Sequence, residues 1–148
     1  MNDCKPASTP LSPNYHLSPA TDKEKAQFEV LGINLCSTVG SIYYLSRATQ
    51  LDLSFAVSTL SPYLENPGIR HWQAFQHLLH YLKGTQDVGI TYHKGEKSGI
   101  VSWSDADWGN CWATQQSVSG FLATFHGCLI LWKTRKQPSV STSTAEAK

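Results

Sequence analysis

The segment at residues 104–110, SDADWGN, contains the side chains whose type and spacing could support chemistry. Asp105 and Asp107 are two positions apart, so both point to one face of the chain if its backbone is extended. Paired carboxylates at a strand end can hold Mg²⁺, and a two-metal nuclease or polymerase site clamps its ions about 4 Å apart. The alternative is a solvated turn whose carboxylates cap nearby backbone groups, and the residues alone favour that alternative.

Glu146 is the only acidic residue that follows Asp107 in the sequence. It lies in residues 142–148, which begin to look helical, and this helix could pack beside the strand that carries Asp105. The alternative is a surface glutamate that the helix dipole favours in a first turn. Taken without further information, the surface glutamate is the favoured interpretation.

Histidine and cysteine offer weaker candidates for a metal site. His77 and His80 are three residues apart on a predicted helix and could share a metal, but the polar face of that helix explains both of them. Cys111, His126 and Cys128 do not have the spacing of zinc ligands. Because the four cysteines are scattered and form no CxxC pair, the sequence predicts neither a zinc site nor a disulfide framework.

Basic side chains cluster in two places along the chain. Such clusters could contact a phosphate backbone, and they could equally be solvated faces. The first group lies on a predicted helix and the second follows Trp132: Arg70, His77, His80 and Lys83, then Lys133, Arg135 and Lys136.

The composition limits the class of protein. The 148 residues are 41% apolar and 16% charged, which suits one small domain or two very small ones and excludes a self-sufficient polymerase. Twelve basic and eleven acidic residues leave a net charge of +1, which alone gives no nucleic-acid signal. The sequence has neither an apolar run of about 18 residues nor the apolar centre of a signal peptide. We therefore expect an intracellular protein, cytoplasmic or nuclear, that is not secreted and contacts no membrane.

The first part of the chain is predicted to be an extended arm followed by helices. Four of the seven prolines lie in the first twenty residues among Ser and Thr, which indicates an arm with little regular structure. Thr21-Asp22 offers an N-cap for a short polar helix through about Phe28. Apolar spacing then predicts longer helices over 34–46, 52–64 and 67–83. The expected caps and breaks are Asp52 and Asn66 as N-caps, Pro62 as a kink or early stop, and Gly84 just after the last helix.

The second part of the chain is predicted to be a sheet. Alternation around Ile90 and Tyr92, and β-prone runs at 100–104, 117–125 and 129–132, indicate strands. His126-Gly127 lies between two of these runs and is typical of a tight hairpin turn. Helices first and strands second predict an α+β organisation.

Seven short stretches, in this order and spacing, resemble the Pol polyprotein of copia-type LTR retrotransposons. Each stretch is modest, but seven in order along most of the chain are specific. They are CKPASTPL (4–11), VGSIYYLSRATQLDLSFAVSTLS (39–61), NPGIRHWQAFQHLLHYLKGT (66–85), SDADWGN (104–110), SVSGF (117–121), LWKTRKQPSVS (131–141) and STAEA (143–147).

The resemblance implies an organisation and a parent activity. Residues 1–21 would follow the palm of a reverse transcriptase, residues 22–86 would form its thumb and connection, and residues 87–148 would open an incomplete ribonuclease H-like domain with a mixed sheet. The parent enzyme would copy RNA into DNA and degrade the RNA strand of the hybrid. The polymerase Tyr-x-Asp-Asp turn lies upstream of the first matched stretch, so we expect this fragment to have no catalysis of its own.

The resemblance also assigns two carboxylates. Asp105 matches the first of four ribonuclease H acidic residues and Glu146 matches the second, whereas Asp107 is not expected to bind metal. The other two aspartates would follow residue 148. We therefore expect Mg²⁺ in the parent enzyme and no stable Mg²⁺ bound by Asp105 and Glu146 alone.

The expected partner is an RNA–DNA hybrid or other nucleic acid, bound weakly and without sequence preference through the two basic groups. The incomplete sheet also predicts self-association through an exposed edge. Two alternatives stay open: a domesticated fragment that binds a host protein, and a ribonuclease H completed by another chain.

The chain departs from the family pattern at several basic positions. The family usually has Arg and Pro where Gln50 and Leu51 stand, basic residues where Gln115 and Gln116 stand, and Glu where Lys148 stands. Changes from Arg to Gln, from Pro to Leu and from Glu to Lys can each arise by one C-to-T transition on one strand or the other, which predicts a source copy decayed by cytosine deamination. The near-neutral charge therefore does not exclude an ancestral surface that contacted nucleic acid.

Overall fold

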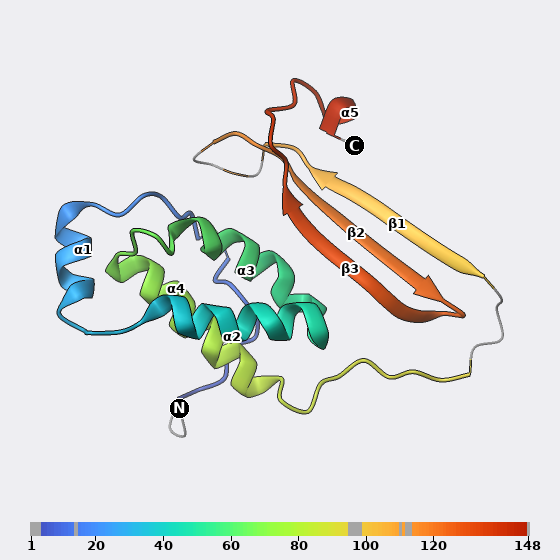
Figure 1. Ribbon diagram of the computed structural model, residues 1–148, viewed down its shortest axis with the longest axis horizontal. Helices are drawn as coiled ribbons and strands as arrows, with labels where there is room; N and C mark the ends of the chain where they lie inside the picture. Colours follow the sequence, from blue (N-terminus) through green and yellow to red (C-terminus); the bar gives the residue numbers. More distant parts are fainter. Residues whose placement is uncertain (1–3, 14, 95–98, 110, 112–113, 148) are drawn as a thin grey trace. The chain divides into compact units, whose positions relative to one another are not determined.

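The computed structural model describes residues 4–13, 15–94, 99–109, 111 and 114–147 (Figure 1). The chain divides into two compact units, Met1–Gly89 and Ile90–Lys148. The first unit is helical and the second contains a sheet, so the α+β class predicted from the sequence is confirmed. Over the described ranges, none of the helices is both long enough and apolar enough to cross a membrane.

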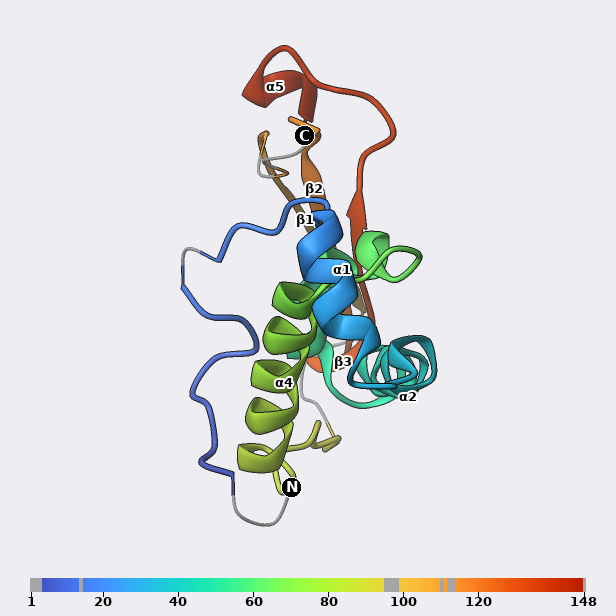
Figure 2. The same ribbon diagram turned by 90° about the vertical axis from the view of Figure 1, so that its left-hand side faces the viewer.

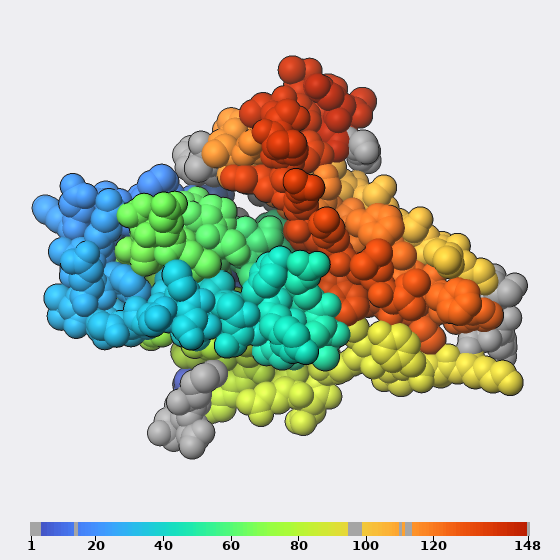
Figure 3. All heavy atoms as spheres, in the orientation of Figure 1, coloured from blue at the N-terminus to red at the C-terminus, as the bar shows by residue number. Residues whose placement is uncertain are grey.

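The helical unit is built around a single apolar core. Its largest fully buried apolar side chains are Leu53, Val57, Phe75 and Leu78, which come from three different elements. α2 covers one face of this unit (Figure 3). The elements are α1 (Asp22–Glu29), α2 (Leu35–Ala48), α3 (Ser54–Leu60) and α4 (Ile69–Gly84), with short 3-10 helices η1 (Leu51–Leu53) and η2 (Ser61–Tyr63) on either side of α3.

The first two helices begin at capping residues that are recognisable in the sequence. Thr21 caps α1 as predicted, and its hydroxyl and backbone N–H form a reciprocal capping box with the backbone N–H and carboxylate of Glu24. Asn34 caps α2 by accepting a hydrogen bond from the backbone N–H of Ser37 at 3.1 Å. Local side-chain chemistry is thus sufficient to start both helices.

The third helix differs from its prediction at its beginning. Asp52 does not cap it, because the chain first makes a 3-10 turn and α3 begins at Ser54. The Asp52 carboxylate instead accepts a hydrogen bond from the hydroxyl of Tyr81, which raises the pKa of Tyr81 to about 12. At the other end, Pro62 stops the α-helix early as predicted, since the chain continues past Leu60 as a 3-10 turn.

α4 begins two residues later than the sequence pattern predicts. Asn66 is not its N-cap; Gly68 is, and the imidazole Nδ1 of His71 accepts the Gly68 N–H at 3.0 Å. A Cβ atom at Gly68 would lie 2.6 Å from the Cβ of Ala20, so only glycine allows the arm to pass so closely. Gly84 is the last residue of α4 and not the residue after it.

The second unit contains a three-stranded antiparallel sheet in the order β1-β2-β3, formed by Ile100–Asp107, Val118–Phe125 and Cys128–Lys136. His126 and Gly127 form the two-residue hairpin turn as predicted, with φ angles of 51° and 81°. The mixed sheet expected from the resemblance is not seen among the described strands. Parallel pairing needs a crossover of about a dozen residues or more, and these strands are joined by shorter connections.

Two further strand predictions need correction. Residues 90–94 were expected to contain a strand around Ile90 and Tyr92, but in the structure they form no β-ladder. Alternation alone does not make a strand, because a ladder also needs a partner backbone. β1 extends three residues further than expected and ends at Asp107, since β2 continues to pair with it as far as Val118. After β3 the chain forms the short helix α5 (Thr144–Ala147).

Gln50 provides a test of whether the family arginine suits this fold better. Its Nε2 donates to the carbonyl of Thr85 at 3.3 Å, but its Oε1 is buried and accepts no hydrogen bond from the described residues. Arginine carries donors only, so Gln50→Arg should remove the unpaired acceptor and raise the free energy of unfolding by about 1 kcal/mol. Urea denaturation measures this change. The matched control is Gln115→Arg at an exposed position, and equal effects of the two variants would contradict the prediction.

Candidate functional site

The two aspartates of the acidic segment lie inside β1 and not in the turn after it. Asp105 pairs with Gly120 and Asp107 pairs with Val118, so the extended backbone continues through both aspartates. Their side chains therefore share one face of the sheet, and both residues are exposed. This satisfies the geometric condition on which the paired-carboxylate hypothesis depends.

The helix that carries Glu146 packs against the strand that carries Asp105. α5 contacts β1, and Ala147 is buried in this contact with 3% of its surface exposed. Two hydrogen bonds hold the preceding loop and the helix end: Trp108 Nε1 donates to the carbonyl of Ser141 at 2.9 Å, and Gln137 Nε2 donates to that of Ala147 at 2.6 Å. The connection between β3 and α5 is thus fixed to the end of the sheet.

The Glu146 carboxylate already has hydrogen-bond partners. Its Oε2 accepts from the backbone N–H of Thr142 at 2.6 Å and from the Thr142 hydroxyl at 2.8 Å. These bonds stabilise the carboxylate and lower the pKa of Glu146. A metal-binding role for Glu146 would therefore use Oε1. Within the described ranges, no three His, Cys, Asp or Glu side chains gather as a metal-binding group.

The N-terminal arm lies beside α4 (Figure 2), and three of the four basic residues predicted on this helix donate side-chain hydrogen bonds to it. Arg70 Nη2 donates to the carbonyl of His16 at 3.2 Å, and His77 Nε2 donates to that of Thr9 at 2.9 Å. Lys83 Nζ donates to the carbonyl of Cys4 at 3.0 Å. These side chains therefore donate to internal carbonyl groups and do not simply form a solvated face.

The basic residues of β3 are divided between the two faces of the sheet. Lys133 and Arg135 pair with Phe121 and Ser119, so they share a face, and both are exposed. Lys136 belongs to the opposite face and is half-buried, with Nζ 3.9 Å from the Sγ of Cys111. The α4 group belongs to the compact unit Met1–Gly89 and the β3 group to the compact unit Ile90–Lys148.

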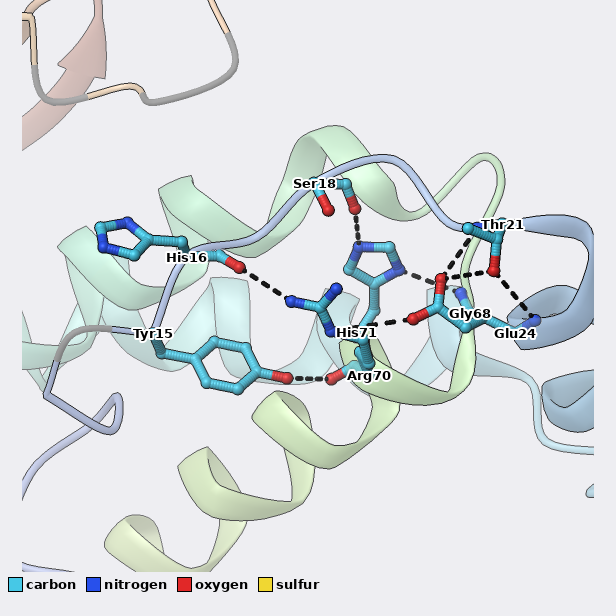
Figure 4. Close-up of polar contacts among 8 residues, drawn as sticks. All are labelled: Tyr15, His16, Ser18, Thr21, Glu24, Gly68, Arg70 and His71. Atoms are coloured by element: carbon cyan, nitrogen blue, oxygen red, sulfur yellow. Dashed lines mark hydrogen bonds and ion pairs between the residues drawn. The ribbon is translucent and has the colours of Figure 1, made fainter.

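His71 is a functional group that the sequence analysis missed (Figure 4). Its Nδ1 accepts the N–H of Gly68, and its Nε2 donates to the carbonyl of Ser18 at 3.0 Å, so the bonds define a neutral imidazole protonated at Nε2. The ring is 3% exposed and stacks on Tyr63 with a centroid distance of 4.5 Å. The signal in the sequence is a hydrogen-bond acceptor three residues after the N-cap, as in a capping box.

An ion pair lies beside His71 and joins α1 to α4. Arg70 Nε is 3.7 Å from Glu24 Oε1, and Glu24 Oε2 accepts two hydrogen bonds from Thr21. The bonds from Thr21, with a smaller effect of the nearby Arg70 charge, lower the pKa of Glu24. The pKa of His71 is also lowered, because burial disfavours its charged form more than the Ser18 bond and the Glu24 charge favour it.

Comparison with known proteins identifies the family. The chain is 36% identical over 152 residues to the retrovirus-related Pol polyprotein from transposon TNT 1-94 of Nicotiana tabacum, covering 100% of this chain and 11% of that protein. It is 37% identical over 150 residues to the retrovirus-related Pol polyprotein from transposon RE2 of Arabidopsis thaliana, covering 100% and 10%. The chain belongs to the copia-type retrotransposon Pol polyproteins.

Shorter relatives also match the chain. An uncharacterized mitochondrial protein of Arabidopsis thaliana is 35% identical over 151 residues, and the chain spans 59% of its length. A protein named secreted RxLR effector protein 161, from Plasmopara viticola, is 37% identical over 110 residues, covering 74% of this chain and 78% of that protein. No protein-family model and no solved structure matches the chain.

The neutral state of His71 predicts acid sensitivity of the helical unit. Because its pKa is lower in the folded chain than in the unfolded chain, the unfolded state binds more protons below pH about 6.5, and stability falls as the pH decreases from there. Because the pKa of Glu24 is lowered in the folded chain, its protonation adds a second loss of stability below about pH 4.5. The urea midpoint should therefore fall between pH 7.5 and 5.5, and His71→Gln should flatten this slope.

The exposed His93 provides the matched control, because His93→Gln removes a titratable imidazole from the other unit. This variant should retain the wild-type slope. A slope that persists unchanged in His71→Gln would contradict the prediction.

Proposed function

We propose that the chain is the part of a copia-type Pol polyprotein that joins the end of the reverse transcriptase to the start of ribonuclease H. On this proposal residues 1–21 follow the palm, residues 22–86 form the thumb and connection, and residues 87–148 open the ribonuclease H domain. The observation that carries the proposal is the packing of α5 against β1. A ribonuclease H site needs its carboxylates brought together from separate elements, and this packing supports that role for Asp105 and Glu146.

The parent activity would be RNA-directed DNA synthesis followed by cleavage of the RNA strand in the hybrid. In the intact enzyme Asp105 and Glu146 would help to hold Mg²⁺, which activates water and stabilises charge at the cleaved phosphate. In this chain Asp105 is an exposed strand residue and Glu146 has only Oε1 outside its bonds to Thr142. We infer that two carboxylates bind Mg²⁺ weakly and that the chain alone cleaves no hybrid efficiently.

Incubation of the chain with an RNA–DNA hybrid and Mg²⁺ tests this inference. The rate of RNA cleavage should equal that of a protein-free sample, and Asp105→Asn should not change it, because two carboxylates are inferred to bind Mg²⁺ only weakly. Ala106→Ser, on the other face of β1, is the matched control for the strand. Mg²⁺-dependent cleavage that Asp105→Asn abolishes and Ala106→Ser retains would show that the chain is an active nuclease.

We also propose residual nucleic-acid binding through basic side chains, with no sequence preference. Lys133 and Arg135 are exposed on one face of the sheet, so they are available to phosphate groups as the chain stands. Lys136, which is half-buried on the other face, would contribute less. The basic residues of α4, Arg70, His77, His80 and Lys83, would contribute according to how far the arm covers them.

Salt titration of binding to an RNA–DNA hybrid tests this proposal. The affinity of the wild-type chain should fall steeply with salt, because each phosphate contact releases counterions. The Lys133→Ala/Arg135→Ala variant should weaken binding and reduce the slope of log K against log salt by about 2, one for each residue. Lys23→Ala/Lys94→Ala changes the net charge equally at exposed sites and should retain most of the slope. Binding that is independent of salt would overturn the proposal.

A second candidate function is a free-standing interaction fragment that associates with itself or with another protein. The sheet favours it, because Ile100, Trp103, Phe125 and Leu131 are large apolar residues with about half or more of their surface exposed. The shorter relatives favour it too, since the effector protein is matched over 78% of its length. The salt titration separates the two candidates, because an interaction fragment would bind no hybrid. If the fragment associates with itself, its apparent molecular mass in solution would rise with protein concentration.

A further inference from the structure

The N-terminal arm follows α4 along its whole length and in the opposite direction (Figure 2). Hydrogen bonds join the two segments from the end of α4 to its beginning. In addition to the bonds from Lys83, His77, Arg70 and His71 described above, the backbone N–H of Ala7 donates to the carbonyl of His80 at 3.3 Å, the hydroxyl of Ser12 bonds with His77 Nδ1 at 3.3 Å, and the hydroxyl of Tyr15 donates to the carbonyl of Arg70 at 2.7 Å.

The contacts show what kind of ligand the polar face of α4 accepts. Lys83, His77 and Arg70 each donate to a backbone carbonyl oxygen of the arm. Carbonyl oxygens carry partial negative charge, and the N–H groups of lysine, arginine and histidine also donate to phosphate oxygens. The arm therefore binds α4 through the same kind of hydrogen bonds that the phosphate groups of a nucleic acid would form with it.

Two glycines allow the arm to approach the ends of α4. A Cβ atom at Gly84 would lie 2.9 Å from the Cβ of Pro6, and one at Gly68 would lie 2.6 Å from that of Ala20. Both distances are too short for two carbon atoms that are not bonded. The fit between arm and helix thus depends on the absence of side chains at both ends.

The two halves of the arm differ in how far their side chains are buried. In the half nearer α1, Leu17 is 6% exposed and belongs to the core, and its carbonyl accepts the hydroxyl of Tyr63 at 2.9 Å. In residues 4–13 none of the side chains is buried, although Leu11 packs partly against the core. Segments that are held by surface hydrogen bonds and little apolar burial open at low cost.

We propose that residues 4–13 are a displaceable strap that covers His77 and Lys83, and that a polyanion such as an RNA–DNA hybrid binds these two residues when the strap lifts. The proposal rests on the proposed nucleic-acid binding of the chain. It assigns the two basic groups different states: Lys133 and Arg135 are available at all times, whereas the distal half of α4 becomes available only after the strap is displaced.

Gly84→Ala tests the proposal in the full chain. The added methyl group collides with Pro6 and lifts the strap, while alanine favours the helical conformation of α4. The amide hydrogen of Ala7 should exchange faster, and the affinity for an RNA–DNA hybrid at low salt should rise by about threefold for each additional phosphate that α4 binds. Gly40→Ala is the matched control, because a Cβ there meets nothing within 4 Å, and both quantities should stay at their wild-type values.

A second substitution identifies the side chain that binds the additional phosphate. In the Gly84→Ala background, Lys83→Ala should remove at least part of the added affinity, whereas Lys23→Ala should not. Faster hydrogen exchange at Ala7 without any increase in affinity would contradict the proposal that the strap covers a binding site on α4. It would leave the proposed binding through β3 unaffected.

Two further outcomes are informative. Ala7→Pro removes the amide that bonds to the carbonyl of His80 and provides an independent way to lift the strap, which is measured by hydrogen exchange of the Ser8 and Thr9 amides. If neither Gly84→Ala nor Ala7→Pro loosens residues 4–13, the arm is a fixed part of the fold and the proposal is wrong. Absence of hybrid binding in the wild-type chain and in all variants would overturn the proposed function together with the strap.

Discussion

The neutral imidazole of His71 is the interaction on which the helical unit depends. One ring nitrogen accepts the N–H of Gly68 at the start of α4, and the other donates to the carbonyl of Ser18 in the arm. A single buried side chain thus begins the longest helix of the unit and fixes the arm to it. Protonation would remove the acceptor and place a charge in a buried position, which is costly, so the network holds only while the ring is neutral.

The arm uses the basic side chains of α4 as hydrogen-bond donors. Extended segments leave their carbonyl groups without partners from regular structure, and these groups need donors. α4 supplies the donors from Arg70, His77 and Lys83, so the same side chains that complete the fold are the ones that a phosphate backbone would need. On β3, by contrast, the sheet supplies the backbone hydrogen bonds, and Lys133 and Arg135 extend into solvent.

The sheet is consistent with a part of a larger structure. β1 pairs with β2 along its full length, but Val101 and Phe125, on opposite faces of the sheet, are each about half exposed. A sheet usually buries at least one face against another layer. The chain spans about a tenth of the length of the two Pol polyproteins described above.

The family, the α+β order, the capping of α1 by Thr21, the stop at Pro62 and the turn at His126-Gly127 follow from the amino-acid sequence alone. These features depend on neighbouring residues, so local spacing reveals them. The packed fold was needed to show that Gly68 caps α4, that Tyr81 bonds to Asp52, and that basic side chains of α4 bond to the arm. Each of these depends on segments about 30 to 80 residues apart, and a hydrogen bond between distant segments has no periodicity in the sequence. The sequence therefore shows which residues are basic, and the fold decides which of their side chains already form hydrogen bonds within the chain.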